Sequence, residues 1–212
     1  MQSYRDYGYK TTAPNHAHRY ILPVLTAMLR PELNRCILDI GCGNGSLALA
    51  LHKLGYQVYG IDASEQGIAL ANQQLPGHFF VQDLQKNSLP EPLATLHFDT
   101  VISTEVIEHL YAPRDFLNFC KKVLSQNPGN KQLFLSTPYH GYWKNLALAI
   151  TGNMDKHFTA LWDGGHIKFW SRKTLSSLLL ESGFMVTDFQ GAGRLPYLWK
   201  SMIIKAELHV EG

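Results

Sequence analysis

Residues 36–45 read CILDIGCGNG, and this segment decides the fold. Cys36–Ile40 is a short, mostly apolar run, which predicts a buried strand. Asn44–Leu54 follows it, with leucines at helical spacing, and Gly55 suits the end of a helix. The segment therefore predicts a strand, a glycine-rich loop and a helix in immediate succession.

This strand–loop–helix unit is typical of a nucleoside site. Glycines permit positive φ and let a ligand approach the backbone closely. The loop would place that ligand beside the N-terminus of the next helix, where N–H groups are free. Asp62 ends the next predicted strand about 20 residues further on, where a carboxylate can accept hydrogen bonds from both ribose hydroxyls.

Three interpretations of the loop stay open at this point. A dinucleotide-binding loop spaces its glycines as GxGxxG, whereas Gly41, Gly43 and Gly45 follow GxGxG. S-adenosylmethionine has no phosphate and carries cationic sulfonium and amino groups. Asp39, just before the loop, would attract that cation and repel a pyrophosphate. The pattern therefore favours S-adenosylmethionine over a nicotinamide or flavin cofactor, and over a purely structural turn.

The rest of the chain alternates predicted strands and helices, which indicates an α/β fold with a mostly parallel sheet covered on both faces. Further strands are predicted at Val58–Ile61, Phe79–Val81, Phe98–Ser103, Gln132–Ser136, Phe184–Phe189 and Met202–Val210. Helices are predicted at Tyr20–Leu29, from Ser64 to Gln74, at Pro113–Ser125 and from Ser171 to Gly183.

The alternation of predicted strands and helices stops at residues 139–165, a long segment rich in aromatic residues and glycine. We expect a single domain over residues 1–212. This insertion after the fifth strand would form a lid over the place where a second substrate, the acceptor, binds. Within it, Trp143, Leu146, Ala147 and Ile150 share one helical face. That stripe predicts either a lid helix packed on its own domain or a peripheral contact with a membrane surface.

Composition narrows the functional classes. The chain has 212 residues, 45% of them hydrophobic and 17% charged, as expected of a globular domain. The formal net charge of +2 gives little reason to expect a nucleic-acid partner. Three cysteines without a paired spacing predict free thiols. Without a visible signal peptide or an apolar run long enough to span a bilayer, we expect a cytoplasmic protein.

With its glycine loop at Gly41–Gly45 and Asp62, the chain resembles the class I S-adenosylmethionine-dependent methyltransferases over about Arg35–Phe189. Within that family it looks most like the branch of the ubiquinone-biosynthesis O-methyltransferases. The resemblance implies a Rossmann-like sheet of seven strands whose last strand is antiparallel. It also implies an adenine contact at Gln82-Asp83-Leu84 and a methionine contact at Ser103-Thr104-Glu105. The full set of expected cofactor residues is Asp39, Gly41, Cys42, Gly43, Asn44, Gly45, Asp62, Ala63, Gln82, Asp83, Leu84, Ser103, Thr104 and Glu105.

A metal site is a further hypothesis. Glu105, Glu108 and His109 have helical spacing and would point the same way on a helical turn. Two carboxylates and an imidazole suit Mg²⁺, Mn²⁺ or Zn²⁺, and His166 offers a distant fourth ligand. The pattern is similar to the metal centre of small-RNA 3′-terminal methyltransferases. The competing interpretation is that Glu105 contacts the cofactor while Glu108 and His109 cap a turn.

Candidate catalytic residues are histidines, because an imidazole titrates near neutrality and serves as a general base. His140, His157 and His166 surround the insertion, and we favour His166, with His109 as the second catalytic candidate. The aromatic residues expected to line an acceptor pocket, or simply to pack the lid, are Trp143, Phe158, Trp162, Phe169 and Trp170.

The leading functional prediction is methyl transfer from S-adenosylmethionine to a small-molecule acceptor, preferably on oxygen, with S-adenosylhomocysteine as the product. Two alternatives remain open. One is a metal-dependent RNA 3′-terminal methyltransferase, and the other is a non-catalytic protein that binds S-adenosylmethionine. The sequence predicts neither the acceptor nor the oligomeric state.

Overall fold

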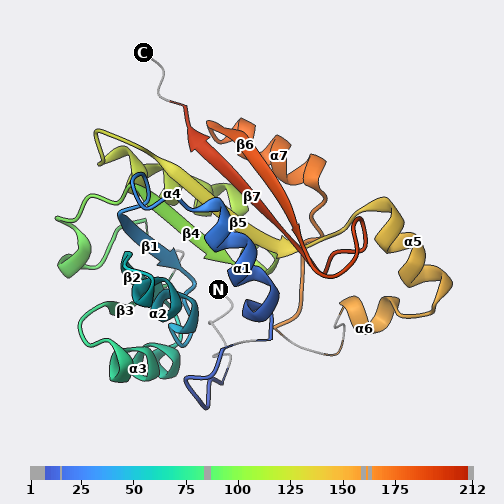
Figure 1. Cartoon of the computed structure of the whole chain (residues 1–212), viewed down its shortest axis with the longest axis horizontal. Helices are drawn as coiled ribbons and strands as arrows, with labels where there is room; N and C mark the ends of the chain where they lie inside the picture. Colours follow the sequence, from blue (N-terminus) through green and yellow to red (C-terminus); the bar gives the residue numbers. More distant parts are fainter. Residues whose placement is uncertain (1–7, 15, 84–86, 159–160, 162–163, 210–212) are drawn as a thin grey trace.

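A computed structural model describes residues 8–14, 16–83, 87–158, 161 and 164–209 (Figure 1). The strands are β1 (Cys36–Ile40), β2 (Gln57–Asp62), β3 (Phe79–Val81), β4 (Thr100–Thr104), β5 (Gln132–Pro138), β6 (Phe184–Ala192) and β7 (Ser201–Leu208). The helices are α1 (His18–Met28), α2 (Ser46–Lys53), α3 (Glu65–Gln74), α4 (Pro113–Ser125), α5 (Tyr142–Ile150), α6 (Met154–Phe158) and α7 (Arg172–Glu181), with short 3₁₀ turns η1 (Glu91–Leu93) and η2 (Ile107–His109).

These strands form one seven-stranded sheet in the order β3-β2-β1-β4-β5-β7-β6. The first five strands pair in parallel, whereas β7 is antiparallel to both of its neighbours, β5 and β6. The predicted fold class is therefore confirmed, including the antiparallel last strand. The strand order reverses direction at β1 and β4, which are neighbours although two strands separate them in the chain. Ligands in open α/β sheets bind at such a point, beyond the carboxyl ends of the strands.

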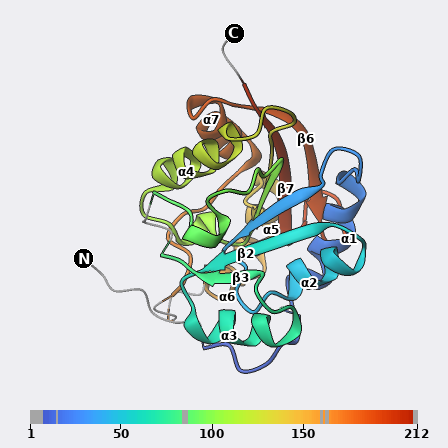
Figure 2. The same cartoon turned by 90° about the vertical axis from the view of Figure 1, so that its left-hand side faces the viewer.

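Helices cover both faces of the sheet, with α4 and α7 on one side and α1 and α2 on the other (Figure 2). The strand side chains alternate between two hydrophobic clusters, because successive residues of a strand point to opposite faces. Leu38 and Ile40 belong to the cluster on the α4 side, whereas Ile37 belongs to the cluster on the α1 side.

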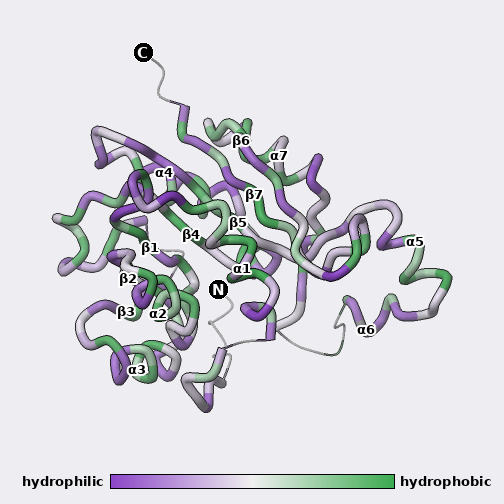
Figure 3. The backbone as a smooth tube through the Cα atoms, in the orientation of Figure 1, coloured by the Kyte–Doolittle hydropathy of each residue, from purple (hydrophilic) through white to green (hydrophobic). Residues whose placement is uncertain are grey.

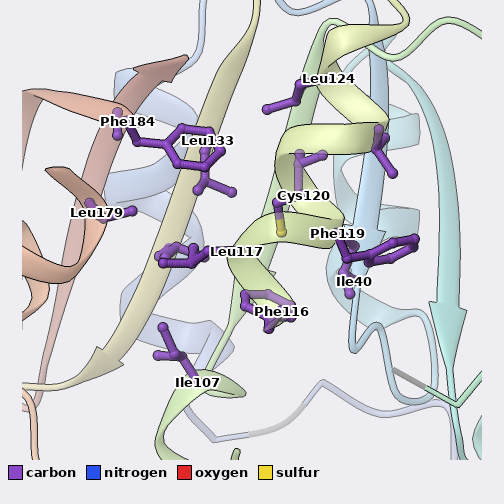
Figure 4. Close-up of a cluster of buried hydrophobic side chains, with 14 of the residues drawn as sticks. Ile40, Ile107, Phe116, Leu117, Phe119, Cys120, Leu124, Leu133, Leu179 and Phe184 are labelled. Atoms are coloured by element: carbon purple, nitrogen blue, oxygen red, sulfur yellow. The ribbon is translucent and has the colours of Figure 1, made fainter. Parts of the chain in front are cut away.

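Helix α4 is the main covering element of its face. It begins at Pro113, which is favourable in the first turn of a helix, and its apolar residues recur at helical spacing. Phe116, Leu117 and Cys120 are buried against the sheet and lie close to Leu133 of β5 and Leu179 of α7 (Figure 4). This packing holds the carboxyl ends of β1 and β4 in fixed positions.

The insertion after β5 differs from the sequence prediction in its detail. It contains α5 and a second short helix, α6, which lie at the edge of the molecule (Figure 1). The apolar stripe on α5 is present, but it is largely exposed: Trp143 and Ile150 retain 60% and 76% of their accessible surface. Together with Pro196–Leu198 the stripe lines an apolar hollow of about 470 Å³.

Candidate active site

The glycine loop joins β1 to α2 and is fixed to β2. The N–H groups of Gly41 and Cys42 donate to the carbonyl of Ile61 at 2.8 and 3.1 Å. Gly41 has a φ of +80°, and a Cβ at this position would collide with the Val106 side chain. A larger residue would therefore be strained and would displace the segment that follows β4. The loop thus connects the two halves of the sheet at the point where their order reverses.

Asp39 lies beneath this loop without a hydrogen-bonding partner. Its side chain is buried, and neither carboxylate oxygen accepts a hydrogen bond from the described residues. Burial, followed by the nearby Asp62 charge, raises the pKa of Asp39 to about 8. A buried carboxylate without a partner is costly unless a cation or donor approaches it. The cationic methionine end of S-adenosylmethionine supplies such a group, so Asp39 fits this cofactor.

Asp62, the last residue of β2, is oriented by backbone donors. One carboxylate oxygen accepts from the N–H of Gly43 at 2.8 Å, and the other accepts from the N–H of Ser64 at 2.7 Å. Carboxylate oxygens are acceptors, the kind of partner that ribose hydroxyls need. The position at the carboxyl end of the strand next to the glycine loop is the one expected for a ribose contact.

Several predicted cofactor residues use their side chains within the protein. Asn44 donates to the carbonyls of Thr11 and Ala13 at 2.8 and 2.9 Å. Ser103 donates to the carbonyl of Ile40 at 2.7 Å and so joins the ends of β4 and β1. Cys42 is buried against Gly60. A cofactor contact by these residues would therefore involve their backbone atoms.

The predicted adenine segment follows β3. Gln82 is buried, and its amide donates to the carbonyls of Asp83 and Ser88 at 3.2 and 3.1 Å. Asp83 is exposed at the surface, as an adenine-edge acceptor requires. Leu84 lies outside the described residues. Ala63 follows Asp62 and is half-buried.

The N-terminal segment lies across the glycine loop, which the sequence analysis did not predict. A Cβ on Gly43 would collide with the hydroxyl of Tyr9, so this tyrosine lies directly on the loop. His18 in α1 is hydrogen-bonded through Nδ1 to Ser46 Oγ at 2.8 Å. With the two Asn44 bonds, these contacts fasten Tyr9, Thr11, Ala13 and His18 over the cofactor side of the site. The only sequence signal was the concentration of aromatic residues at this end of the chain.

Glu105 follows β4 in a strained conformation. Its φ is +55°, in the left-handed region that non-glycine residues rarely adopt, and such strain is common at functional sites. Its carboxylate accepts hydrogen bonds from Ser136 at 2.8 Å and from Ser201 at 3.0 Å. Burial raises the pKa of Glu105 to about 7, although both serine bonds oppose that shift. The assumption that Glu105 lies on a helical turn was wrong, because only Ile107–His109 are helical.

Three of the four predicted metal ligands lie together. Candidate ligand atoms of Glu108, His109 and His166 are all within 4.8 Å of one another. Glu108 is buried; one of its carboxylate oxygens accepts from Thr137 at 3.0 Å, and the other has no hydrogen-bonding partner among the described residues. The Nδ1 atom of His109 lies 3.2 Å from the carbonyl of Gly165. The Nε2 atom lies 3.9 Å from Glu108 Oε1. With the proton on Nδ1, Nε2 can offer a lone pair to a metal, the arrangement common to metal-binding histidines.

The electrostatics of this group suit a divalent cation. Burial, and then Glu105, raise the pKa of Glu108 above its usual range. Burial lowers the pKa of His109 and lowers that of His166 to about 4, so both imidazoles are neutral at pH 7. Neutral imidazoles and a buried carboxylate are the donor set that Zn²⁺ and related ions select.

The insertion adds two further histidines to this side of the site. His140 and His157 lie with their ring centroids 4.8 Å apart, and His140 also packs edge-on against Phe169 at 5.1 Å. Burial lowers the pKa of each imidazole to about 4. Phe158 and Phe169 pack together, as predicted, whereas Trp143 is exposed on α5. Trp162 lies outside the described residues.

Fold and site together define the class I S-adenosylmethionine-dependent methyltransferases. The chain belongs to the methyltransferase-domain family, whose model matches residues 13–188. It is 32% identical over 165 residues to the ubiquinone biosynthesis O-methyltransferase of Bradyrhizobium diazoefficiens and 33% identical over 178 residues to that of Roseobacter denitrificans. These alignments cover 76% and 82% of this chain.

The chain spans 62% of the length of the Bradyrhizobium relative and 69% of that of the Roseobacter relative. Among solved structures, it is similar to magnesium protoporphyrin IX methyltransferase from Synechocystis with bound S-adenosylhomocysteine. The TM-score is 0.66 at 22% identity, covering 91% of this chain and 84% of that one. At this identity the likeness establishes the fold.

Proposed function

We propose that this chain transfers a methyl group from S-adenosylmethionine to an oxygen atom of a small-molecule acceptor. The observation that carries the proposal is the placement of two unlike groups at the carboxyl edge of the sheet. The unpaired Asp39 carboxylate lies under the glycine loop, and the Glu108–His109–His166 group lies beyond Glu105. The first suits a cationic methyl donor, and the second suits a hydroxyl that must lose a proton.

Different residues of the site would bind the cofactor and align it with the acceptor. Asp39 would hold the cationic end of the cofactor, Asp62 would accept from its ribose hydroxyls, and the loop would leave space for it. Because the sulfonium already activates the methyl group, the protein has to align donor and acceptor and exclude water. Glu105, whose carboxylate accepts hydrogen bonds from Ser136 and Ser201, would contact the methionine moiety.

The second part of the proposal is a divalent metal, Mg²⁺, Mn²⁺ or Zn²⁺, held by Glu108, His109 and His166. When bound there, such an ion lowers the pKa of a coordinated acceptor hydroxyl. Glu105 remains a candidate fourth ligand, although both of its oxygens are hydrogen-bonded to serines. In the absence of metal, His109 or His166 is the candidate general base.

The relatives support oxygen as the acceptor atom, since the Bradyrhizobium and Roseobacter proteins are named as O-methyltransferases of ubiquinone biosynthesis. In the described residues no helix is long and apolar enough to cross a membrane. Hydrophobic residues recur along α5 (Figure 3), and the exposed Trp143 and Ile150 among them support peripheral contact with a membrane that holds a lipophilic acceptor. We propose the cytoplasm as the compartment, because Cys36, Cys42 and Cys120 are free thiols, as expected in a reducing environment.

The RNA 3′-terminal methyltransferase alternative is favoured by one observation, the carboxylate and two imidazoles that gather as its sequence pattern predicts. The net charge of +2 opposes it, because binding to a phosphate backbone usually needs clustered basic residues. A silent S-adenosylmethionine-binding protein is the other alternative, and any turnover of the cofactor would exclude it.

A screen with methyl-labelled S-adenosylmethionine separates these functions. Phenols, catechols, amines and short RNAs are offered as acceptors, each with Mg²⁺, Mn²⁺ or Zn²⁺ and each with EDTA. Label in a catechol or phenol, dependent on the metal, is the expected result. Label in RNA alone would show that the chain is an RNA methyltransferase instead. No label in any acceptor would contradict the proposal.

A further inference from the structure

Lys144 is the only buried residue of helix α5. It retains 8% of its accessible surface, whereas the neighbouring Tyr142 and Trp143 retain 73% and 60%. The helix thus reverses the usual arrangement, because its apolar side chains face outward and its lysine faces the protein. Burying an ammonium group is costly unless it is paired, so this orientation requires a compensating partner.

The described residues supply only part of the hydrogen bonding that the buried Lys144 ammonium group needs. Its Nζ donates one hydrogen bond, to the carbonyl of Lys200 at 3.1 Å. An ammonium group carries three N–H donors, and no other described residue accepts from it. Burial lowers the pKa of Lys144 to about 8; the Glu105 carboxylate opposes this shift, and the Lys200 charge adds to it. The missing partner of Lys144 is therefore an anion or a strong acceptor.

The free donors of Lys144 belong to the acceptor side of the site. The carbonyl of Lys200, which accepts from Lys144, is followed directly by Ser201, whose hydroxyl donates to Glu105. The end of β4, the insertion and the segment before α7 are joined by two backbone bonds, from Ile167 N–H to the Glu108 carbonyl and from His140 N–H to the Trp170 carbonyl. The lysine charge also acts on Glu105 and on the imidazoles of His140, His157 and His166. A molecule placed to receive a methyl group next to Glu105 would lie within reach of this cation.

We propose that Lys144 binds an ionised oxygen of the methyl acceptor, a phenolate or a carboxylate, and so selects anionic acceptors and positions them. This inference rests on the proposed function, since it assigns a residue to the acceptor half of that site. A charge-assisted hydrogen bond to a carboxylate or phenolate is about twice as strong as a neutral one. It would also give the Lys144 ammonium group a second hydrogen-bond acceptor beside the Lys200 carbonyl.

A purely structural role would be to fasten α5, through the Lys200 carbonyl, to the residue that precedes β7. Two variants distinguish the roles. Lys144→Gln keeps an N–H donor for that carbonyl but removes the charge, and Lys144→Arg keeps both. Lys53→Met, on the exposed end of α2, is the matched control for loss of a lysine away from the site.

The test is binding of three acceptors in the presence of S-adenosylhomocysteine and EDTA at pH 7.5, below the pKa of Lys144. The ligands are 4-nitrocatechol, which is ionised at the ring oxygen, 3,4-dihydroxybenzoate, which carries a carboxylate, and catechol, which is neutral. We expect Lys144→Gln to raise the Kd of one or both anions about tenfold, with Lys144→Arg and Lys53→Met near the wild-type value. The anion that is affected identifies phenolate or carboxylate as the partner.

Catechol binding should change less than twofold in every variant. An equal loss for all three ligands in Lys144→Gln would indicate the fastening role and overturn the inference. Unchanged anion binding, or no anion binding to the wild-type protein, would overturn it as well. Turnover is read separately: Lys144-dependent anion binding without methyl transfer contradicts the proposed function alone, and turnover without Lys144-dependent binding contradicts this inference alone.

Discussion

Ser201, the first residue of β7, donates a hydrogen bond of 3.0 Å to the carboxylate of Glu105, across 96 residues of sequence. This contact ties the antiparallel last strand to the strained residue that ends the β4 segment. The site is therefore held together from both halves of the sheet, and Glu105 cannot rotate without losing bonds to two serines.

Replacing Ser201 with alanine tests the importance of that orientation. We expect kcat/KM for methyl transfer to fall about tenfold, because a hydrogen bond to a buried charged group contributes about 1.5–3 kcal/mol. Ser182→Ala, whose hydroxyl bonds to Leu178 at the end of α7, should leave activity unchanged. Equal activity of both variants would show that the Ser201 bond does not position Glu105.

Asp39→Asn should abolish binding of S-adenosylmethionine while stabilising the cofactor-free protein at alkaline pH. Isothermal titration calorimetry measures the first effect, and Asp188→Asn on β6 serves as the control. The asparagine keeps the shape of the side chain but cannot ionise, so it removes the attraction to a cationic ligand. Wild-type affinity in the variant would show that Asp39 does not contact the cofactor.

The stability effect has a defined sign. The pKa of Asp39 rises from 3.8 in the unfolded chain to about 8 in the folded protein, so the folded state binds more protons between these values. The contribution of Asp39 to the free energy of unfolding must therefore fall as pH rises through this range, by at most ~1.4 kcal/mol per pH unit. Urea unfolding at pH 5.5, 7 and 8.5 should show the Asp39→Asn variant gaining stability over the wild type as pH rises. A constant difference would refute the raised pKa.

Glu108→Gln and His166→Ala should reduce metal content and activity together. We expect elemental analysis of protein purified without chelators to show a divalent metal in the wild type and little in either variant, with activity reduced about 100-fold. His97→Ala, a histidine remote from the site on the surface, is the control. If the wild type carries no metal and stays active in EDTA, the metal should be dropped from the account.

Asn44→Ala should release the N-terminal segment from the glycine loop. Both bonds from Asn44 to the carbonyls of Thr11 and Ala13 would be lost, so we expect faster hydrogen exchange in residues 9–18 and a several-fold weaker affinity for S-adenosylmethionine. Asn127→Ala, in an exposed turn, is the comparison. Unchanged exchange in residues 9–18 would show that other contacts hold the segment.

Features that depend on residues close together in the chain were predictable from the sequence. The strand at Cys36–Ile40 and the helix at Pro113–Ser125 have the predicted bounds, because apolar periodicity and a terminal proline mark them directly. The loop between β1 and α2 and the position of Asp62 at the end of β2 were predictable for the same reason, and their roles in binding the cofactor stay predictions.

Features that depend on long-range packing were not predictable. The left-handed conformation of Glu105 arises from tertiary contacts with Ser136 and Ser201, so helical spacing was a misleading guide to its direction. The bonds from the Asn44 side chain to a segment more than 30 residues away could not be inferred from its place in the glycine loop. The inward orientation of Lys144 also escaped prediction, because the apolar stripe of α5 suggested that the opposite face would be buried.

The most direct test of the central claim is ¹³C NMR of the reaction mixture with S-[methyl-¹³C]adenosylmethionine, a catechol acceptor and Mg²⁺. The account predicts a new methoxy carbon signal that grows with wild-type protein, is absent with Asp39→Asn and disappears when EDTA replaces the metal. A labelled methyl group that stays on the cofactor with every acceptor, or that appears only on nitrogen or carbon, would contradict it.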